Sequence, residues 1–172
     1  MDNHGFIREV LDIKILILFV LSRLSGEVDA ETLADLCRAD SGFGYFEYSD
    51  CLSDLVDTGH VELNENGYLI TDKGRKNAEA VSGSLPFSVR SKTLELIKPV
   101  EEIIRRRAMI ETRCCNEGDS CRVRFTLSDG AGELLSMSFL CSDEDSAAKA
   151  ESRFRASAED YYLKIVKMFC ED

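Results

Sequence analysis

The segment Val56–Arg75 constrains the fold of this chain more than any other stretch. It begins at the end of an apolar helical stripe, and Gly59 follows where helices commonly stop in the left-handed conformation. Asn66–Gly67 stands between two short runs that alternate apolar and polar residues, which predicts a tight β-hairpin. Thr71 is then placed to cap a helix over Asp72–Val81. The segment therefore predicts the succession helix, two-stranded ribbon, helix.

Apolar spacing predicts three helices before this ribbon. We expect them from Asp12, as the cap, to about Leu24, from Asp29 or Ala30 through Cys37, and over Tyr45–Thr58. Three helices, a hairpin and a fourth helix form the order of a winged helix-turn-helix domain, which we place at residues 1–82. In such domains the third helix normally lies in the DNA major groove.

Residues 83–172 predict an α-β-β-β-α region with a dimerisation or regulatory role. Pro86 suits the first turn of a long helix that reaches Arg107. Three strands of an antiparallel sheet are expected at Met109–Cys115, Cys121–Ser128 and Glu133–Cys141. Ser142 and Asp145 resemble a capping box for a final helix that ends near Phe169. The whole chain is therefore expected to be α+β.

The final helix predicts a homodimer. It exceeds the average length of about 11–12 residues, and a chain of this size has little other surface with which to cover it. The buried stripe of this helix supplies the candidate interface residues, which are Phe154, Ala158, Tyr161, Ile165 and Met168.

The negative charge of the chain argues against DNA binding. The net charge is −11, and the first 80 residues carry seven Lys and Arg against sixteen Asp and Glu. Helix 45–58 has no cation, whereas DNA affinity rests largely on cations that contact phosphates. The candidate DNA contacts are polar and aromatic residues of that helix, two amides of the hairpin, and cations after the hairpin and in the second half. They are Tyr45, Tyr48, Ser49, Ser53, Asn64, Asn66, Lys73, Arg75, Lys76, Arg105 and Arg106.

Two functions from different classes remain open. The first is a DNA-binding transcriptional regulator that acts as a homodimer. The alternative is a protein-interaction module whose acidic third helix docks on a partner with a basic surface. Each charged feature also has a plain structural explanation. The acidic residues can form a solvated helix face, and Arg105–Arg107 can offset the dipole at a helix end.

The sequence contains no recognisable catalytic, metal-binding or cofactor-binding motif. His4 and His60 are not placed for acid–base chemistry, so we expect no enzyme activity and no cofactor. Seven cysteines without an export signal favour reduced thiols over a disulfide framework, and no CxxC pair suggests a metal. The longest apolar run, Ile13–Leu21, is about half of the ~20 residues that cross a bilayer. We therefore expect a cytoplasmic protein without a membrane segment.

The chain also resembles a known family over nearly its whole length. The resemblance is carried by DIKILILFVLSRL, GYFEYSDCLSDLVDTGHVEL, GYLITDKGR, SLPFSVRSK and LSDGAGELLSMSF. These segments are similar to a winged-helix family of clostridial-type Firmicutes that is catalogued only as a domain of unknown function. The resemblance implies a PadR-like or MarR-like winged helix, an α+β C-terminal region and a role in transcription. It implies no catalytic residues and no binding site.

Overall fold

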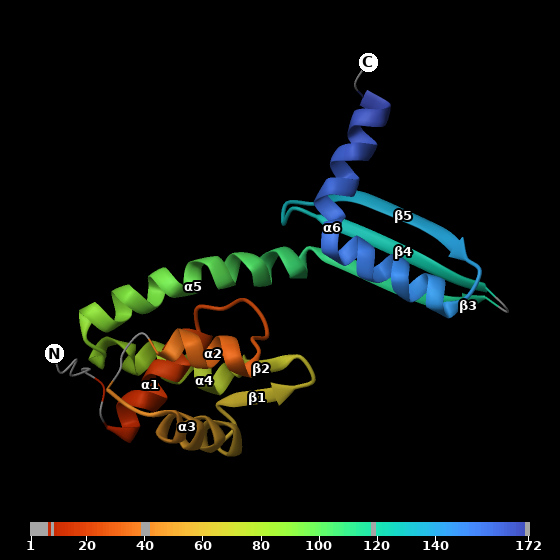
Figure 1. Cartoon of the computed structure of the whole chain (residues 1–172). Helices are drawn as coiled ribbons and strands as arrows, with labels where there is room; N and C mark the ends of the chain where they lie inside the picture. Colours follow the sequence, from red (N-terminus) through yellow and green to blue (C-terminus); the bar gives the residue numbers. More distant parts are fainter. Residues whose placement is uncertain (1–6, 8, 39–41, 118–119, 171–172) are drawn as a thin grey trace. The chain divides into compact units, whose positions relative to one another are not determined.

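The computed structural model describes residues 7, 9–38, 42–117 and 120–170 (Figure 1). The chain divides into two compact units, residues 1–105 and 106–172. Helices, an antiparallel three-stranded sheet and a long C-terminal helix give it an α+β fold, as the sequence predicts.

The first unit contains four helices, a two-stranded hairpin, a single 3-10 turn and a fifth, longer helix among its described residues. Their bounds are α1 Val10–Leu21, α2 Ala30–Cys37, α3 Tyr45–Asp57, β1 Val61–Asn64, β2 Gly67–Ile70, α4 Asp72–Val81, η1 Ser82–Ser84 and α5 Phe87–Ala108.

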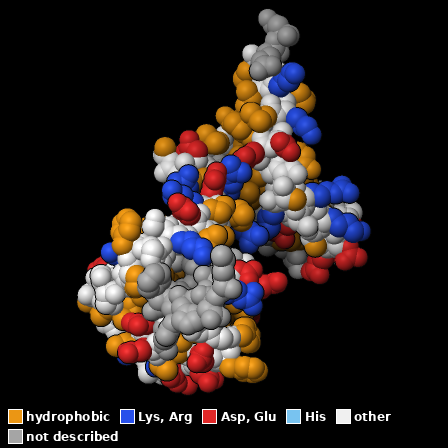
Figure 2. All heavy atoms as spheres, turned by 60° about the vertical axis from the view of Figure 1, so that its left-hand side comes forward, with side chains coloured by type: hydrophobic (Ala, Val, Ile, Leu, Met, Phe, Trp, Pro, Cys, Tyr) orange, Lys and Arg blue, Asp and Glu red, His pale blue; other side chains and the backbone are white. Residues whose placement is uncertain are grey.

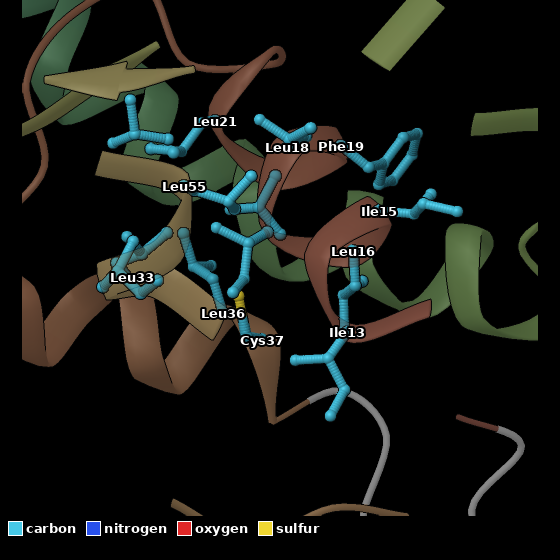
Figure 3. Packing of buried hydrophobic residues seen from close by; sticks show 14 of the residues in the cluster. Ile13, Ile15, Leu16, Leu18, Phe19, Leu21, Leu33, Leu36, Cys37 and Leu55 are labelled. Carbon is cyan, nitrogen blue, oxygen red and sulfur yellow. The ribbon is translucent and has the colours of Figure 1, made fainter. Parts of the chain in front are cut away.

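Helix α1 forms the centre of this unit because it is apolar on every side. From Ile15 to Leu21 each of its residues is buried, as expected of a helix enclosed by its neighbours. Figure 3 shows Leu33 and Leu36 of α2 and Leu55 of α3 together with the side chains of α1 in one cluster. The core of the first unit is thus built around a single helix.

The hairpin is joined to the chain before α2. Strands β1 and β2 pair antiparallel, with Asn64 opposite Gly67. Val28, in the connection between α1 and α2, forms an additional antiparallel bridge with Tyr68 of β2. The backbone N–H of Val28 donates to the carbonyl of Tyr68, and the N–H of Tyr68 donates back. The hairpin therefore gains a third, one-residue edge from a distant part of the sequence.

One predicted helix cap is confirmed, two are wrong, and a further cap lies at Asp29, where the sequence predicts a helix start at Asp29 or Ala30. The Thr71 hydroxyl accepts from Gly74 N–H at 3.1 Å, and an Asp29 carboxylate oxygen accepts from Thr32 N–H at 2.9 Å. Asp12, however, lies inside the first turn of α1, because the helix begins two residues earlier. At the last helix the cap is Asp143 rather than Ser142, since an Asp143 carboxylate oxygen accepts from Ser146 N–H at 2.7 Å.

Most of α5 belongs to the first unit. Leu85 and three residues of α5, Val89, Ile97 and Ile104, are part of the core around α1. The compact units consequently divide between Arg105 and Arg106, whereas the sequence analysis divides the chain after residue 82.

The second unit is a three-stranded sheet covered on one face by a helix. Strands β3 Ile110–Glu117, β4 Ser120–Ser128 and β5 Glu133–Cys141 pair antiparallel in the order β3-β4-β5. Helix α6, Glu144–Cys170, lies across this sheet with the first part of its length (Figure 1). Its core contains Val123, Phe125 and Leu127 of β4 with Phe154 of α6.

One cysteine pair corrects the prediction that all seven thiols are free. Cys114 of β3 and Cys121 of β4 form a disulfide. The strand register places Cys114 opposite Val123, so Cys121 is its diagonal neighbour on the same face of the sheet. Such neighbours lie close enough for a disulfide, which cysteine spacing alone does not reveal. The other cysteines are free, and Cys115 lies exposed on the opposite face.

Candidate nucleic-acid interface

Helix α3 presents a mixed aromatic and polar surface. Tyr45, Ser49 and Ser53 are exposed on it, as expected of groups that face a ligand. Tyr48 is not, because only 5% of it is exposed and it packs in the core. The prediction that Tyr48 faces a DNA groove is therefore corrected: it falls on the same side of α3 as Cys51, Leu52 and Leu55.

Two of the acidic residues of α3 have partners within the first unit. A Glu47 carboxylate oxygen accepts from Gly44 N–H at 2.7 Å and caps the helix start, where a negative charge is favourable. Lys14 of α1 lies 3.0 Å from a carboxylate oxygen of Asp54. Asp50 and Asp57 are exposed and form no salt bridge with any residue that the structure describes. Much of the acidic face thus has a role inside the first unit.

The hairpin offers amide side chains at its tip. Asn66 is exposed in the turn, while the Asn64 amide donates to a Glu27 carboxylate oxygen at 2.9 Å. Leu63 is exposed on β1. A ligand that contacts the tip therefore meets the Asn64 amide, which is already hydrogen-bonded to Glu27, and the Asn66 amide, which lies in the turn.

The cations after the hairpin lie close to α1 and α3. Lys73 donates to the carbonyl of Thr58 at 2.6 Å, and Arg75 donates to the carbonyl of Ser22 at 3.3 Å. Both carbonyls belong to the C-terminal caps of helices, where the helix dipole attracts positive charge. Lys76 is exposed on α4. The structure thus holds Lys73 at the C-terminal end of α3 and Arg75 at the C-terminal end of α1.

His60 joins the end of α3 to α4. Its Nε2 lies 2.8 Å from the Asn77 amide nitrogen, and its Nδ1 lies 2.8 Å from the Thr58 hydroxyl. An amide nitrogen is a donor, so Nε2 accepts and the ring is neutral. Burial, and then the nearby Lys73 and Lys14, lower the pKa of His60. His60 therefore acts as a neutral structural bridge.

The model of a domain of unknown function, DUF4364, matches residues 13–169. The chain belongs to this family. No curated protein and no solved structure matches the DUF4364 chain. The match covers α3, the hairpin and the cations after it, together with the sheet and nearly all of α6.

Arg105 and Arg106 of the DUF4364 chain fall in different units. Arg105 closes the first unit and is exposed. Arg106 opens the second, where its Nε lies 4.0 Å from a Glu159 carboxylate oxygen of α6. The two predicted contacts therefore belong to different compact units.

The predicted dimer residues separate into buried and accessible groups. Phe154 and Ala158 are buried in the core of their own unit, and Phe154 stacks on Phe125 with ring centroids 4.6 Å apart. They are corrected to core residues, since the sheet already covers them. Tyr161 and Met168 are exposed and Ile165 is half-buried, so these three remain available.

One exposed aromatic residue was missed by the sequence analysis. Phe46 follows Tyr45 at the start of α3 and is 83% exposed, with the two ring centroids 6.3 Å apart. Its place away from the stripe of Tyr48, Cys51 and Leu52 is the sequence signal that could have found it. Together with Tyr45, Phe46 gives the start of α3 an exposed aromatic surface.

The described part of the chain contains no candidate metal site and no helix suited to crossing a membrane. Within it, no group of three or more His, Cys, Asp or Glu side chains is arranged to hold a metal ion. None of its helices combines the length and the apolar character that crossing a bilayer requires.

Proposed function

We propose that residues 1–82 form a winged helix-turn-helix and that the protein is a cytoplasmic, DNA-binding transcriptional regulator that acts as a homodimer. The observation that carries this proposal is the bridge between Val28 and Tyr68. It adds a strand residue between α1 and α2 to the hairpin that follows α3. The resulting order of helix, edge strand, two helices, hairpin and helix supports the proposal of a winged helix.

In this proposal α3 enters the major groove and the hairpin contacts the flanking backbone. Tyr45, Ser49 and Ser53 are then the groups that face base edges, since they are exposed on α3. Phosphate contacts come from Lys73, Arg75 and Lys76, with Asn64 and Asn66 at the hairpin tip. The hydrogen bond of Lys73 to the Thr58 carbonyl supports the proposal, because it holds this cation at the C-terminal end of α3.

A second function is favoured by the composition of the α3 surface. Its exposed side combines the aromatic rings of Tyr45 and Phe46 with the exposed carboxylates of Asp50 and Asp57. Carboxylates repel DNA phosphates, whereas an aromatic and acidic surface suits a partner protein with a basic patch. In this alternative the winged helix is a protein-docking module.

DNA titration at a series of salt concentrations tests the first function. We expect binding to random-sequence duplex at low salt, and Lys73→Ala with Arg75→Ala should weaken it and reduce the salt slope by about 1 per lost phosphate contact. Lys92→Ala with Lys98→Ala, two exposed cations on α5, is the control with the same change of net charge. No binding at low salt contradicts DNA binding, and equal slopes for the two pairs remove the hairpin region from the interface.

A matched pair of acidic variants separates the second function from the first. Asp50→Asn with Asp57→Asn neutralises the exposed α3 face, and Glu31→Gln with Glu79→Gln removes two exposed charges elsewhere. If α3 docks on a basic protein, only the first pair should reduce capture of partners from nuclease-treated lysate. If α3 enters DNA, the first pair should raise DNA affinity more than the control pair. If the two pairs of variants behave alike in both assays, Asp50 and Asp57 are only solvent-exposed residues without a binding role.

A further inference from the structure

Helix α6 changes character at Ser157. The backbone of Ser157 leaves the helical region, with φ −147° and ψ 32°. Before this break Ala147 and Phe154 are buried against the sheet, and Ala158 directly after it is the last buried residue of the helix. We call the remaining segment, Ala158–Cys170, the α6 end. The break divides α6 into a part that the sheet covers and a part that it does not.

The α6 end carries apolar side chains into solvent. Met168 is 75% exposed and Phe169 is 80% exposed, and Figure 2 shows hydrophobic side chains along the helix below its grey terminal residues. An isolated helix shorter than about 12–15 residues is marginal in water. At 13 residues the α6 end lies in this range, so a covering surface would stabilise it as a helix.

The α6 end has an apolar stripe of its own. After the break, Ala158 is followed at helical spacing by Tyr161, Ile165 and Met168. Lys164 flanks this stripe, while Leu163 and Lys167 lie on the opposite side of the helix. Across the break Tyr161 stacks on Phe154 with ring centroids 6.3 Å apart, so the stripe of the α6 end meets the core of the unit.

An apolar groove opens at the base of the α6 end. It has a volume of about 340 Å³. It is lined by Phe125, Met137 and Phe139 of the sheet and by Ala150, Arg153, Phe154, Tyr161 and Ile165 of α6. Arg153 is the one charged residue in this lining, and it forms no salt bridge with any described residue. The groove therefore suits an apolar occupant with a negative end.

We propose that the α6 end of a second copy fills this groove. In a two-fold arrangement the two α6 ends cross antiparallel, with Tyr161 beside the partner's Ile165. Met168 and Phe169 of each copy then reach the groove of the other. The C-terminal end of the partner helix, which is the negative end of its dipole, arrives beside Arg153.

A second copy explains the whole surface better than a small molecule does. A small apolar anion would match Arg153 and fill the groove, but it would leave Met168 and Phe169 exposed. The antiparallel pair covers both features with one element that the chain already carries. Covering Tyr161, Ile165, Met168 and Phe169 on both copies removes on the order of 1,000 Å² from water, which is the scale of a specific interface.

This inference rests on the homodimer in the proposed function and gives it an interface, and it needs no DNA. Light scattering of the full chain tests it at tens of micromolar concentration. We expect twice the mass of the 19.3 kDa chain for wild type and the monomer mass for Phe169→Glu. Leu163→Glu is the matched control, because Leu163 lies in the same segment, is also exposed and points away from the stripe. It should retain the mass of wild type.

A fluorescent probe reports on the groove itself. Anilinonaphthalene sulfonate is an apolar anion, so we expect Phe169→Glu to bind it in the vacated groove and wild type to bind much less. Arg153→Gln added to Phe169→Glu should weaken this binding. Circular dichroism of each variant verifies that the sheet and helices remain folded.

Three results would overturn the proposal in distinguishable ways. A monomeric wild type removes the dimer from both this inference and the proposed function, while DNA binding is judged separately. If Phe169→Glu leaves the dimer intact, or if Leu163→Glu disrupts it equally, the protein is a dimer but the proposed stripe of the α6 end is not its interface. A monomeric wild type whose groove binds the probe through Arg153 assigns the groove to a small apolar anion instead.

Discussion

Val28 and Tyr68 exchange two backbone hydrogen bonds across forty residues of sequence. Val28 N–H donates to the Tyr68 carbonyl at 3.1 Å, and Tyr68 N–H donates to the Val28 carbonyl at 2.8 Å. Gly67 lies beside this bridge with φ +141°, a conformation that side-chain-bearing residues rarely adopt. A Cβ on Gly67 would lie 2.2 Å from the Val28 carbonyl oxygen. The bridge therefore depends on glycine at the start of β2.

Gly67→Ala should consequently lower the stability of the first unit. The added methyl group must displace Val28, and the backbone conformation is itself unfavourable for alanine, so we expect a loss of about 1–3 kcal/mol. Urea unfolding followed by circular dichroism measures it. Gly83→Ala is the control, since a Cβ there meets nothing within 4 Å. Equal midpoints for the two variants would show that the bridge does not constrain the hairpin.

His60 should make the first unit less stable in mild acid. Its pKa is lowered in the folded chain, so the unfolded chain binds the proton more readily. The contribution of neutral His60 is complete above the unfolded value near 6.5 and is lost as pH falls toward the folded pKa. We expect the urea midpoint of wild type to fall between about pH 7 and 5.5, above the range where carboxylates titrate.

His60→Gln provides the comparison for this pH effect. Its side-chain oxygen can still accept from the Asn77 amide but does not titrate. The variant should therefore show a flatter midpoint over the same pH range. A parallel decline in both proteins would assign the effect to other groups.

Thr93 should be replaceable by valine with a gain in stability. It is fully buried in α5, and its hydroxyl has no hydrogen-bond partner among the residues that the structure describes. Removing an unsatisfied hydroxyl while keeping the shape should raise the free energy of unfolding by about 1 kcal/mol. Thermal unfolding measures the change, and Thr93→Ala, which leaves a cavity, should not reproduce it. A lower melting temperature for Thr93→Val would mean that the hydroxyl is bonded in solution.

The Cys114–Cys121 disulfide should leave five of the seven thiols reactive in unfolded, non-reduced protein. Mass spectrometry after alkylation counts them directly. Cys114→Ser should lower the free energy of unfolding by roughly 2–3 kcal/mol, because the bond closes a short loop in the unfolded chain. Cys115→Ser is the control, since Cys115 is free and exposed. Seven reactive thiols would show that the pair is reduced.

Elements specified by neighbouring residues were predictable from the sequence. Asn66–Gly67 favours a tight hairpin through its own backbone preferences, and strands β1 and β2 meet at Asn64 and Gly67. Thr71 caps α4 through an amide three residues away, so the start of that helix is also a local property. The spacing of apolar side chains predicted the extent of α6 in the same local way, but not the break at Ser157.

Features that depend on partners distant in sequence were decided by the tertiary structure. Tyr48 is buried because the stripe of α3 that it shares with Leu52 packs against α1, a segment distant in sequence. Cys114 and Cys121 meet because the register of β3 and β4 places them diagonally on one face. The bridge between Val28 and Tyr68 likewise requires the folded core to bring two segments together. Turns and caps arise from a few adjacent dihedral angles, whereas burial, register and the exposed α6 end depend on which surfaces the whole chain brings into contact.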